Sequence, residues 1–247
     1  MTERIFIGTS NISLPGNKLS FPKKFQDKSR LHYYSSLFNS LEVNSSFYKT
    51  PLPSTFTKWS LDTATEFQFS VKLTRDITHV KKLAAGVEGI EKFILAANEL
   101  QQKRGCLLVQ FPGKITLDYF STVEQILTAV ADAGARDPWR VAVEFRHASW
   151  YVSETMEMLD EYKASVVMHD IPGSKNQEVN KKAPFVYYRF HGPAGDYRGS
   201  YDSAFLHDTA KDIKKWTAEG KTVFAYFNNT IGSAYDNALL LKKFTRS

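Results

Sequence analysis

Residues 106–146 read CLLVQFPGKITLDYFSTVEQILTAVADAGARDPWRVAVEFR and contain two apolar strand candidates on either side of an amphipathic segment. The strand candidates, Cys106 to Phe111 and Arg140 to Arg146, are rich in Val, Leu and Phe. The segment between them carries apolar residues at helical spacing, namely Leu117, Phe120, Val123, Ile126, Leu127 and Val130. A strand, a helix and a second strand in this order indicate two parallel strands joined by a crossover helix.

The same alternation recurs along the chain and gives eight strand candidates. They are Arg4 to Thr9, Leu41 to Phe47, Glu66 to Lys72, Cys106 to Phe111, Arg140 to Arg146, Ala164 to Asp170, Phe185 to His191 and Thr222 to Asn228. A TIM-like (β/α)8 barrel has eight parallel strands and typically about 250 residues, and this chain has 247. We therefore expect an α/β protein in which residues 1–247 form a single TIM-like barrel domain. A doubly wound open sheet is the alternative.

Helix candidates separate most of these strands. The further ones are Ile90 to Leu100, Ser153 to Leu159, Leu206 to Trp216 and Ser233 to Leu241. Residues 171–184 do not have a helical pattern, because Pro172, Gly173 and the pair Lys181 and Lys182 interrupt any apolar stripe. The sequence thus predicts that an irregular loop replaces one crossover helix.

Composition places the chain among ordinary globular proteins. Hydrophobic residues make up 43% and charged residues 23%, which argues against disordered, collagen-like and fibrous classes. No run approaches the roughly 18 apolar residues that cross a bilayer, and the start of the sequence lacks the features of a secretion signal. We therefore expect a cytoplasmic protein with no membrane partner. The single cysteine, Cys106, stands in an apolar run and is expected to be a buried thiol rather than a nucleophile.

Polar residues gather at the C-terminal ends of the strand candidates. Three strands end in polar pairs two positions apart, and such residues lie on one face of a strand. The pairs are Glu42 and Asn44, Glu144 and Arg146, and Arg189 and His191. The other polar residues at strand ends are Lys72, Gln110, His169, Asp170, Asn228 and Asn229. Barrel enzymes build their active sites at this end, so the pattern predicts an active or binding pocket. The alternative is a set of groups that only pair with one another inside the barrel.

Four separated motifs resemble the YecE-like family, also called domain of unknown function 72. They are Leu41 to Tyr48, Phe69 to Lys72 with Ile77 to His79, Val143 to His147 with Ser149 and Trp150, and Phe227 to Asn229. The resemblance runs from Gly8 to nearly the C-terminus and implies a TIM-barrel fold, but no established reaction. The characteristic residues that it implies are Glu42, Asn44, Tyr48, Lys72, His79, Gln110, Pro112, Glu144, Arg146, His147, Trp150, Asp170, Arg189, His191, Asn228 and Asn229. The first loop departs from the family pattern, since Ile12 and Leu14 replace aromatic residues.

These residue types predict acid–base chemistry. We expect Glu144 to be a general base, with Glu42 or His191 as the proton donor. Lys72, Arg146 and Arg189 are expected to hold or stabilise negative charge. Neutral hydrogen bonds from Asn44, Gln110, Asn228 and Asn229 are expected to orient the ligand. An ion-pair ring of Glu144 with Arg146 or Arg189, which only closes the barrel, is the alternative.

The net charge of the chain and two of its loops bear on the class of ligand. The formal net charge of +6 weakly favours anionic partners. The loops 191–201 and 228–233 are glycine-containing and follow the seventh and eighth strands, where barrels often bind phosphate, and Arg189 and Arg198 are candidates for its contacts. Turn formation alone is the other explanation for these glycines. The sequence contains no dinucleotide fingerprint and no P-loop, so we expect no nucleotide cofactor.

A divalent metal is a further possibility. Glu42, Glu144, Asp170 and His191 are residue types that bind Mg, Mn or Zn. No short ligand spacing supports a metal site, and the neighbouring cations would oppose one.

Nucleic acid is a possible partner. Aromatic residues in or next to the top loops, with basic residues after the third strand, are typical of surfaces on which bases stack. The aromatic residues are Tyr48, Trp150, Tyr151, Tyr197 and Tyr201, and the basic set is Lys72, Arg75, His79, Lys81 and Lys82.

Three functional hypotheses follow. The favoured one is an enzyme with an acid–base or hydrolytic pocket for a phosphorylated or otherwise anionic small molecule. The second is a nucleic-acid-binding protein or metal-dependent phosphodiesterase. The third is a noncatalytic binding scaffold, since a fold does not establish catalysis.

Overall fold

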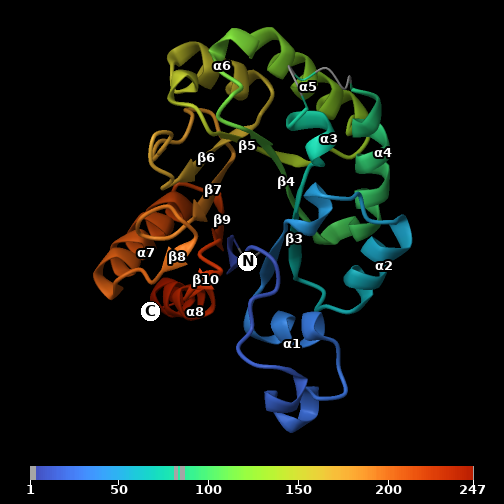
Figure 1. The fold of residues 1–247 in the computed structure, drawn as a ribbon, viewed down its shortest axis with the longest axis vertical. Coiled ribbons are helices and arrows are strands. Elements are labelled where there is room, and N and C mark those ends of the chain that lie inside the picture. The colour runs from blue at the N-terminus through green and yellow to red at the C-terminus, as the bar shows by residue number, and fades with distance from the viewer. Residues whose placement is uncertain (1–3, 81–82, 84–86, 247) are drawn as a thin grey trace.

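An eight-stranded parallel sheet curls into a nearly closed barrel at the centre of the molecule (Figure 1). This computed structural model describes residues 4–80, 83 and 87–246. The barrel strands are β1 (Ile5–Thr9), β2 (Ser40–Val43), β3 (Gln68–Lys72), β4 (Arg104–Phe111), β5 (Arg140–Phe145), β6 (Ser165–His169), β7 (Phe185–Phe190) and β9 (Thr222–Phe227). Their order in the sheet is β1-β9-β7-β6-β5-β4-β3-β2. The TIM-like barrel is confirmed, and all eight predicted strands are present with boundaries shifted by a few residues at most.

Helices surround the outside of the barrel (Figure 1). They are α1 (Arg30–Leu37), α2 (Pro53–Leu61), α3 (Arg75–Thr78), α4 (Glu88–Ala97), α5 (Phe120–Ala133), α6 (Ser153–Glu161), α7 (Ser203–Ala218) and α8 (Ala234–Arg246). Short 3-10 turns are η1 (Lys18–Ser20), η2 (Lys23–Phe25), η3 (Ser45–Phe47), η5 (Asn98–Lys103), η6 (Leu117–Tyr119) and η7 (Ala148–Trp150). Residues 170–184 between β6 and β7 are described throughout and form no helix, which confirms the predicted irregular loop.

Some elements had no clear sequence pattern. Helices α1 and α2 bury few residues, namely Leu31 and Tyr34 in the first and Phe56 in the second, so neither shows a full apolar stripe. Two short strands, β8 (Arg198–Gly199) and β10 (Ile231–Gly232), pair in parallel outside the barrel and join the loops that follow β7 and β9.

The interior of the barrel changes character along the strands. We call its apolar part the lower cluster, which contains Phe6, Cys106, Leu108, Ala142, Val167, Phe185, Tyr187, Phe224 and Tyr226. These residues alternate along their strands with others that pack outward in the main core, as the two faces of a strand require. Two positions beyond Leu108 and Ala142, on the same inward face, stand Gln110 and Glu144.

We call the polar part that follows the upper layer, and we define it as Glu42, Lys72, Gln110, Glu144, Arg189 and His191. These side chains lie at the C-terminal strand ends and are buried, with exposures of 8% or less. The loops beyond them form the barrel mouth.

Strands β1 and β2 close the barrel with little direct pairing. One isolated parallel bridge joins Ser10 and Glu42. Below it, the hydroxyl of Tyr34 from α1 accepts a hydrogen bond from the Thr9 amide at 2.7 Å and donates to the Ser40 carbonyl at 3.1 Å. A tyrosine side chain thus takes the place of part of the backbone ladder at this seam.

The seam leaves no room for a side chain at Gly8. A Cβ atom there would lie 2.0 Å from the Ser40 carbonyl oxygen, which no real contact allows. Further down, the Asn39 amide bridges the strand edge, since it accepts from the Ile7 amide at 2.9 Å and donates to the Ile5 carbonyl at 2.7 Å. The seam is therefore held by specific side chains.

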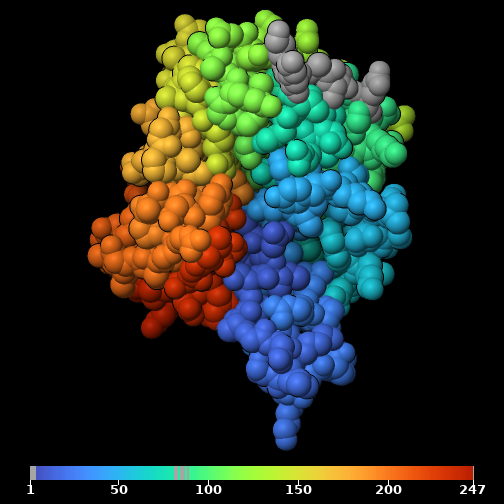
Figure 2. Space-filling view, viewed as in Figure 1, coloured from blue at the N-terminus to red at the C-terminus, as the bar shows by residue number. Residues whose placement is uncertain are grey.

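The segment between β1 and α1, residues 11–29, contains η1 and η2 and projects from the body of the molecule (Figure 2). Among the described residues, no helix combines the length and the apolar character needed to span a membrane.

Candidate functional site

Two buried carboxylates are bridged by one arginine in the upper layer. Arg189 Nε and Nη2 donate to the Glu42 carboxylate at 2.9 and 2.8 Å, and Nη1 donates to Glu144 Oε2 at 2.6 Å. All three residues are at most 1% exposed. Buried charges persist where each is paired and hydrogen-bonded. Arg189 therefore holds both carboxylates inside the barrel and has little freedom to contact a ligand.

Glu42 has hydrogen bonds on both oxygens besides its ion pair. Ser10 Oγ donates to Oε1 at 2.5 Å, and the Tyr187 hydroxyl donates to Oε2 at 2.7 Å. Burial raises the pKa of Glu42, but the Arg189 cation and these hydrogen bonds outweigh it and hold the pKa below its usual value. Glu42 thus stays ionised and anchors Arg189.

Glu144 lies between two arginines. Its second oxygen, Oε1, accepts from Arg146 Nε. Burial raises the pKa of Glu144, yet the adjacent Arg146 and Arg189 cations lower it well below the usual value. A carboxylate with so low a pKa accepts a proton poorly, which weakens its predicted role as general base.

Arg146 extends from this pair to the barrel mouth. Its Nη2 lies 3.2 Å from His191 Nε2 and its Nη1 lies 3.3 Å from the Tyr197 hydroxyl. The Arg146 side chain is 15% exposed, so its outer nitrogens lie at the edge of the buried layer. These nitrogens contact neutral groups and are free to exchange them for an anion.

His191 has a defined tautomer. Because arginine can only donate, His191 Nε2 accepts from Arg146, so Nδ1 carries the proton and donates to Asp170 Oδ1 at 3.3 Å. Asp170 also accepts from the Tyr201 hydroxyl. Burial lowers the pKa of His191 to about 4, although Asp170 opposes this shift. The imidazole is therefore neutral near pH 7, contrary to what a ready proton donor requires.

Lys72 belongs to a chain of hydrogen bonds on the opposite side of the mouth. Its Nζ donates to Gln110 Oε1 at 2.8 Å and lies 4.1 Å from the centre of the Phe47 ring. The Gln110 amide nitrogen is 3.3 Å from His79 Nε2, and His79 Nδ1 is 2.8 Å from Thr78 Oγ1. The amide nitrogen donates, so His79 accepts through Nε2 and carries its proton on Nδ1.

The ammonium of Lys72 is destabilised where it lies. Burial lowers the pKa of Lys72 to about 7, the Arg189 and Arg146 cations add to this, and Glu144 and Glu42 partly offset it. Burial also lowers the pKa of His79 to about 4, with Lys72 as the next cause. Within the described residues, Lys72 forms no ion pair with a carboxylate. Of the upper-layer groups, this amine is the one whose proton affinity matches neutral pH.

The three predicted asparagines differ in their burial and in their hydrogen bonds. The Asn44 side chain oxygen is buried and accepts no hydrogen bond from the described residues. Asn228 is half-buried at the end of β9. Asn229 donates to the Gly199 carbonyl and to Asn237 Oδ1, both at 3.0 Å, and thereby stabilises the loops.

Two further predicted contacts lie away from the upper layer. Trp150 is completely buried, stacks on Phe145 at 4.3 Å and donates its indole N–H to the Ile115 carbonyl at 2.7 Å. The chain leaves β5 at Phe145, so these residues turn to the outer core. His147 Nδ1 accepts from the Ser149 amide at 3.2 Å and caps the turn η7.

The glycine-containing loops use several of their N–H groups internally. The Tyr197 amide donates to the His191 carbonyl at 2.6 Å, and the Ile231 amide donates to the Tyr197 carbonyl at 3.1 Å. Gly192 has a φ of 105° and packs against Arg198, so it serves this loop structure directly. Arg198 itself is exposed. Turn formation, rather than phosphate binding, therefore accounts for much of the conformation of these glycine-containing loops.

The four candidate metal ligands do not converge. Within residues 4–80, 83 and 87–246, no group of three His, Cys, Asp or Glu side chains is arranged to hold a metal ion. Arg189 occupies the position between Glu42 and Glu144, and its cation takes the place that a metal would need.

A sequence model of the family described as "Protein of unknown function DUF72" matches residues 6–247. The chain belongs to the DUF72 family. This confirms the resemblance carried by the four motifs.

Relatives of this DUF72 chain extend over nearly its whole length. It is 26% identical to the UPF0759 protein YunF of Bacillus subtilis, with 88% of this chain and 86% of the relative aligned. A DUF72 crystal structure from Thermotoga maritima is 25% identical, with a TM-score of 0.81 over 99% of this chain and 100% of the other. One from Enterococcus faecalis is 22% identical, with a TM-score of 0.79 over 98% and 96%. These likenesses support the barrel fold and assign no activity.

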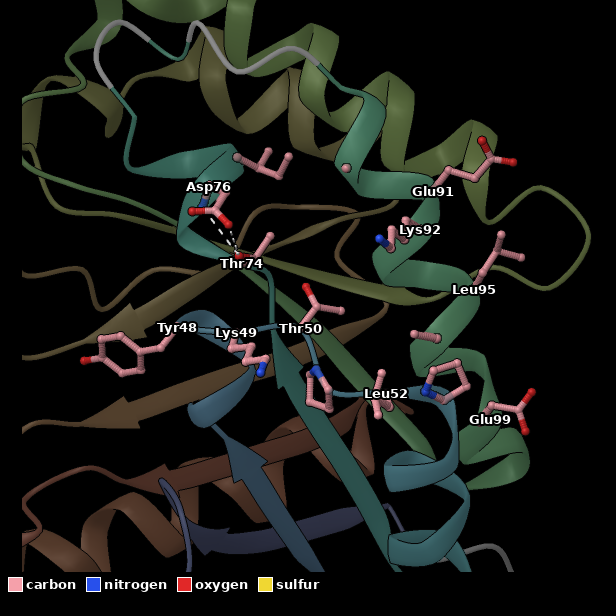
Figure 3. A pocket seen from close by; sticks show the side chains of 15 residues that line it. Tyr48, Lys49, Thr50, Leu52, Thr74, Asp76, Glu91, Lys92, Leu95 and Glu99 are labelled. Atoms are coloured by element: carbon pink, nitrogen blue, oxygen red, sulfur yellow. Dashed lines mark hydrogen bonds between the residues drawn. The ribbon is translucent and has the colours of Figure 1, made fainter.

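Tyr48 lies outside the upper layer of this DUF72 protein. It is 70% exposed, and its ring contacts the Phe47 ring at 5.2 Å. It borders an outer cavity of about 890 Å³ between the segment 48–53 and α4. In Figure 3, Tyr48 lies on the side of the cavity opposite Glu91 and Lys92, and its ring points away from them. Tyr48 is thus a rim residue rather than a part of the buried network.

Few of the aromatic residues proposed for base stacking are exposed. Trp150 and Tyr201 are buried, and the Tyr151 hydroxyl donates to the Phe145 carbonyl at 2.9 Å. Tyr48 and Tyr197 remain available at the surface. The basic residues predicted at positions 81 and 82, Lys81 and Lys82, lie outside the described residues.

Ser10 and Tyr187 belong to the network but were not predicted, and Tyr197 and Tyr201 were predicted only as residues on which bases stack. Tyr187 precedes Arg189 by two positions and so shares its face of the strand, a signal that the sequence contained. The tyrosines of the loop after β7 reach the mouth only because that loop folds back, and no periodicity indicates this.

Proposed function

We propose that the barrel mouth is the active site of an enzyme that performs acid–base chemistry on a phosphorylated or otherwise anionic small molecule. The observation that carries this proposal is a buried amine, Lys72, hydrogen-bonded to a neutral amide beside carboxylates that are already paired with arginines. A pKa of about 7 lets this amine take up and release a proton at neutral pH.

Lys72 replaces Glu144 as the favoured proton carrier. Both oxygens of Glu144 accept hydrogen bonds from guanidinium groups, and its low pKa makes it a weak base. We assign Glu144 and Glu42 the role of fixing Arg146 and Arg189 and of balancing their charge. Since pairs of groups with divergent pKa values divide acid and base roles, Lys72 takes the proton and the carboxylates stay ionised.

Arg146 is the favoured anion contact. Its outer nitrogens contact the Tyr197 hydroxyl and His191 at more than 3 Å, so a carboxylate or phosphate oxygen offers a stronger, charge-assisted bond.

Binding is tested by calorimetric titration with inorganic phosphate, phosphoglycolate and pyruvate. We expect binding of at least one anion by the wild-type protein and a loss of about tenfold or more in the Arg146→Gln variant, because a charge-assisted hydrogen bond contributes roughly 1.5–3 kcal/mol. Arg136→Gln, in the exposed loop that precedes β5 at the opposite end of the barrel, is the matched control. Equal affinity in all three proteins would contradict the proposed anion site.

Proton transfer is tested by NMR in D2O with the anion that binds. We expect deuterium to enter a carbon-bound position of pyruvate or phosphoglycolate in the presence of wild-type protein, and not with Lys72→Met. Binding without exchange in the wild type would favour the noncatalytic scaffold. Binding of a single-stranded oligonucleotide that weakens steeply with salt, without binding of the small anions, would favour the nucleic-acid hypothesis.

A further inference from the structure

We propose that Lys72 is also a covalent nucleophile, whose amine condenses with the carbonyl group of an aldehyde or ketone that carries a carboxylate or phosphate. This inference rests on the proposed function, because the same mouth has to bind the anionic part of the substrate. It adds a substrate class, an anionic carbonyl compound, and a covalent intermediate.

The surroundings of Lys72 differ from those of a structural lysine. Lys103, for comparison, is held by three oxygen acceptors, the carbonyls of Ser60 and Thr63 and the Thr63 hydroxyl. Lys72 donates to one neutral amide oxygen of Gln110 and otherwise faces the Phe47 ring. A lysine that only stabilised the fold would be expected to have more acceptors in so buried a position. With Gln110 as its one acceptor among the described residues, the amine is free to react.

Charge favours the neutral form of this amine. Burial and the cations Arg189 and Arg146 bring the pKa of Lys72 to about 7, against the pull of Glu144 and Glu42. A substantial fraction of the molecules then carries a neutral amine at pH 7, whereas an ordinary lysine with a pKa of about 10.4 is almost entirely charged there. Only the neutral amine attacks a carbonyl carbon, and lysines activated in this way form Schiff bases.

A chain of hydrogen bonds through Gln110 and His79 fixes the position of the Lys72 amine. Gln110 is held by His79 on its amide nitrogen, and His79 is held by Thr78, so the amide oxygen faces Nζ. Gln110 and His79 are thus positioning residues, which direct the Lys72 amine without touching the substrate.

The condensation balances without an oxidant or a reductant. The lone pair of Nζ forms a bond to the carbonyl carbon and gives a carbinolamine. The carbon–oxygen bond then breaks, a carbon–nitrogen double bond forms, and the two hydrogens of the amine leave with the oxygen as water. Protonation of the imine nitrogen makes it an electron sink, so a proton on the adjacent carbon becomes easier to remove.

The test is reductive trapping at pH 7 with glyoxylate or pyruvate and sodium cyanoborohydride, followed by peptide mass spectrometry. Lys49 and Lys92, which are exposed on the outer cavity, are internal controls in the same chain. We expect Lys72 to be labelled at least tenfold faster than either control, since its lowered pKa makes the reactive neutral amine available at pH 7. Labelling of Lys49 and Lys92 with Lys72 unmodified would overturn the proposal.

The pH profile and one variant separate the two proposals. We expect the rate of labelling at Lys72 to rise with pH and to level off above about pH 7, where its amine is neutral. In Arg146→Gln we expect labelling of Lys72 by pyruvate to slow about tenfold. Anion binding without any labelling of Lys72 would remove the covalent step and leave the acid–base proposal. Labelling that is equally fast in Arg146→Gln would keep the nucleophile and remove the anion site.

Discussion

The lower cluster and the upper layer of the barrel interior share strands β4, β5 and β7, where their residues follow one another two positions apart, and the two groups are stabilised in opposite ways. In the lower cluster, apolar side chains such as Leu108 and Phe224 fill the barrel, and burial itself supplies the free energy. In the upper layer, burial opposes folding, and the Arg189 bridge offsets its cost. Well-packed apolar residues often replace a buried charged layer with little loss of stability, so stability alone does not account for the upper layer.

The largest expected effect is the loss of the bridge. Arg189→Met leaves Glu42 buried without a cation and Glu144 with Arg146 alone. We expect the free energy of unfolding at pH 7 to fall by about 3–5 kcal/mol, as is usual when one partner of a buried pair is removed. Urea denaturation measures this directly.

The pH dependence of this loss follows from the sign of the pKa shifts. In the wild type the folded pKa values of Glu42 and Glu144 are lowered, so their contribution is present above the unfolded value of about 4.3 and is lost as pH falls through the folded values. In Arg189→Met, burial raises the pKa of Glu42. Protonation of Glu42 in acid therefore removes part of the destabilisation of the variant. The difference in the free energy of unfolding between the wild type and the variant should therefore become smaller between pH 7 and pH 5. A deficit that is constant with pH would contradict the bridge as its cause.

Leu108→Ala in the lower cluster is the apolar counterpart. We expect a loss of about 3 kcal/mol from the cavity left by a fully buried side chain. No charge is involved, so the loss should be the same at pH 5 and pH 7. If this loss varied with pH as strongly as that of Arg189→Met, the distinction between the two regions would fail.

Lys72→Met sharpens the comparison within the upper layer. The unfolded chain binds a proton at Lys72 up to about pH 10.4, but the folded protein releases it near pH 7. Wild-type stability should therefore rise with pH between these values, by up to about 1.4 kcal/mol per pH unit from this group. The variant lacks this slope. Parallel stability curves for the two proteins between pH 7 and pH 9 would show that Lys72 is charged when folded.

The smallest effect is expected at the boundary between the two regions. The Tyr226 hydroxyl contacts Ser40 Oγ at 2.5 Å and Ser70 Oγ at 2.8 Å, directly below the charged groups. Both serines have further partners, since Ser40 Oγ also donates to the Gln68 carbonyl and Ser70 Oγ accepts from the Cys106 amide. Tyr226→Phe should therefore lower the free energy of unfolding by about 1 kcal/mol. A loss as large as that of Arg189→Met would place this hydroxyl inside the charged network.

The sequence predicted the barrel because alternation along a strand is a local property. Leu108, Gln110, Ala142 and Glu144 show their shared face within a few residues. The partners of these side chains are not local. Arg189 joins carboxylates from two distant strands, and only the closed barrel brings them together.

The expected roles of individual site residues also depend on partners that are distant in sequence. Glu144 was a plausible base from its position, but its low pKa depends on two guanidinium groups placed by the fold. Trp150 follows a site motif in sequence, yet the turn η7 directs it into the outer core. Residue type and spacing therefore indicated which strand ends carry polar groups, while the charge states required the three-dimensional arrangement.

The seam between β1 and β2 has a consequence for how the chain acquires its structure. Five residues of β1 pair in register with β9, whereas one bridge joins β1 to β2. During synthesis from the N-terminus, the first barrel strand therefore lacks its main hydrogen-bonding partner until residues 222–227 have been made. Contacts of such large sequence separation form slowly. Closure of the barrel is thus a late event, and the edge of β1 stays open to wrong partners until then.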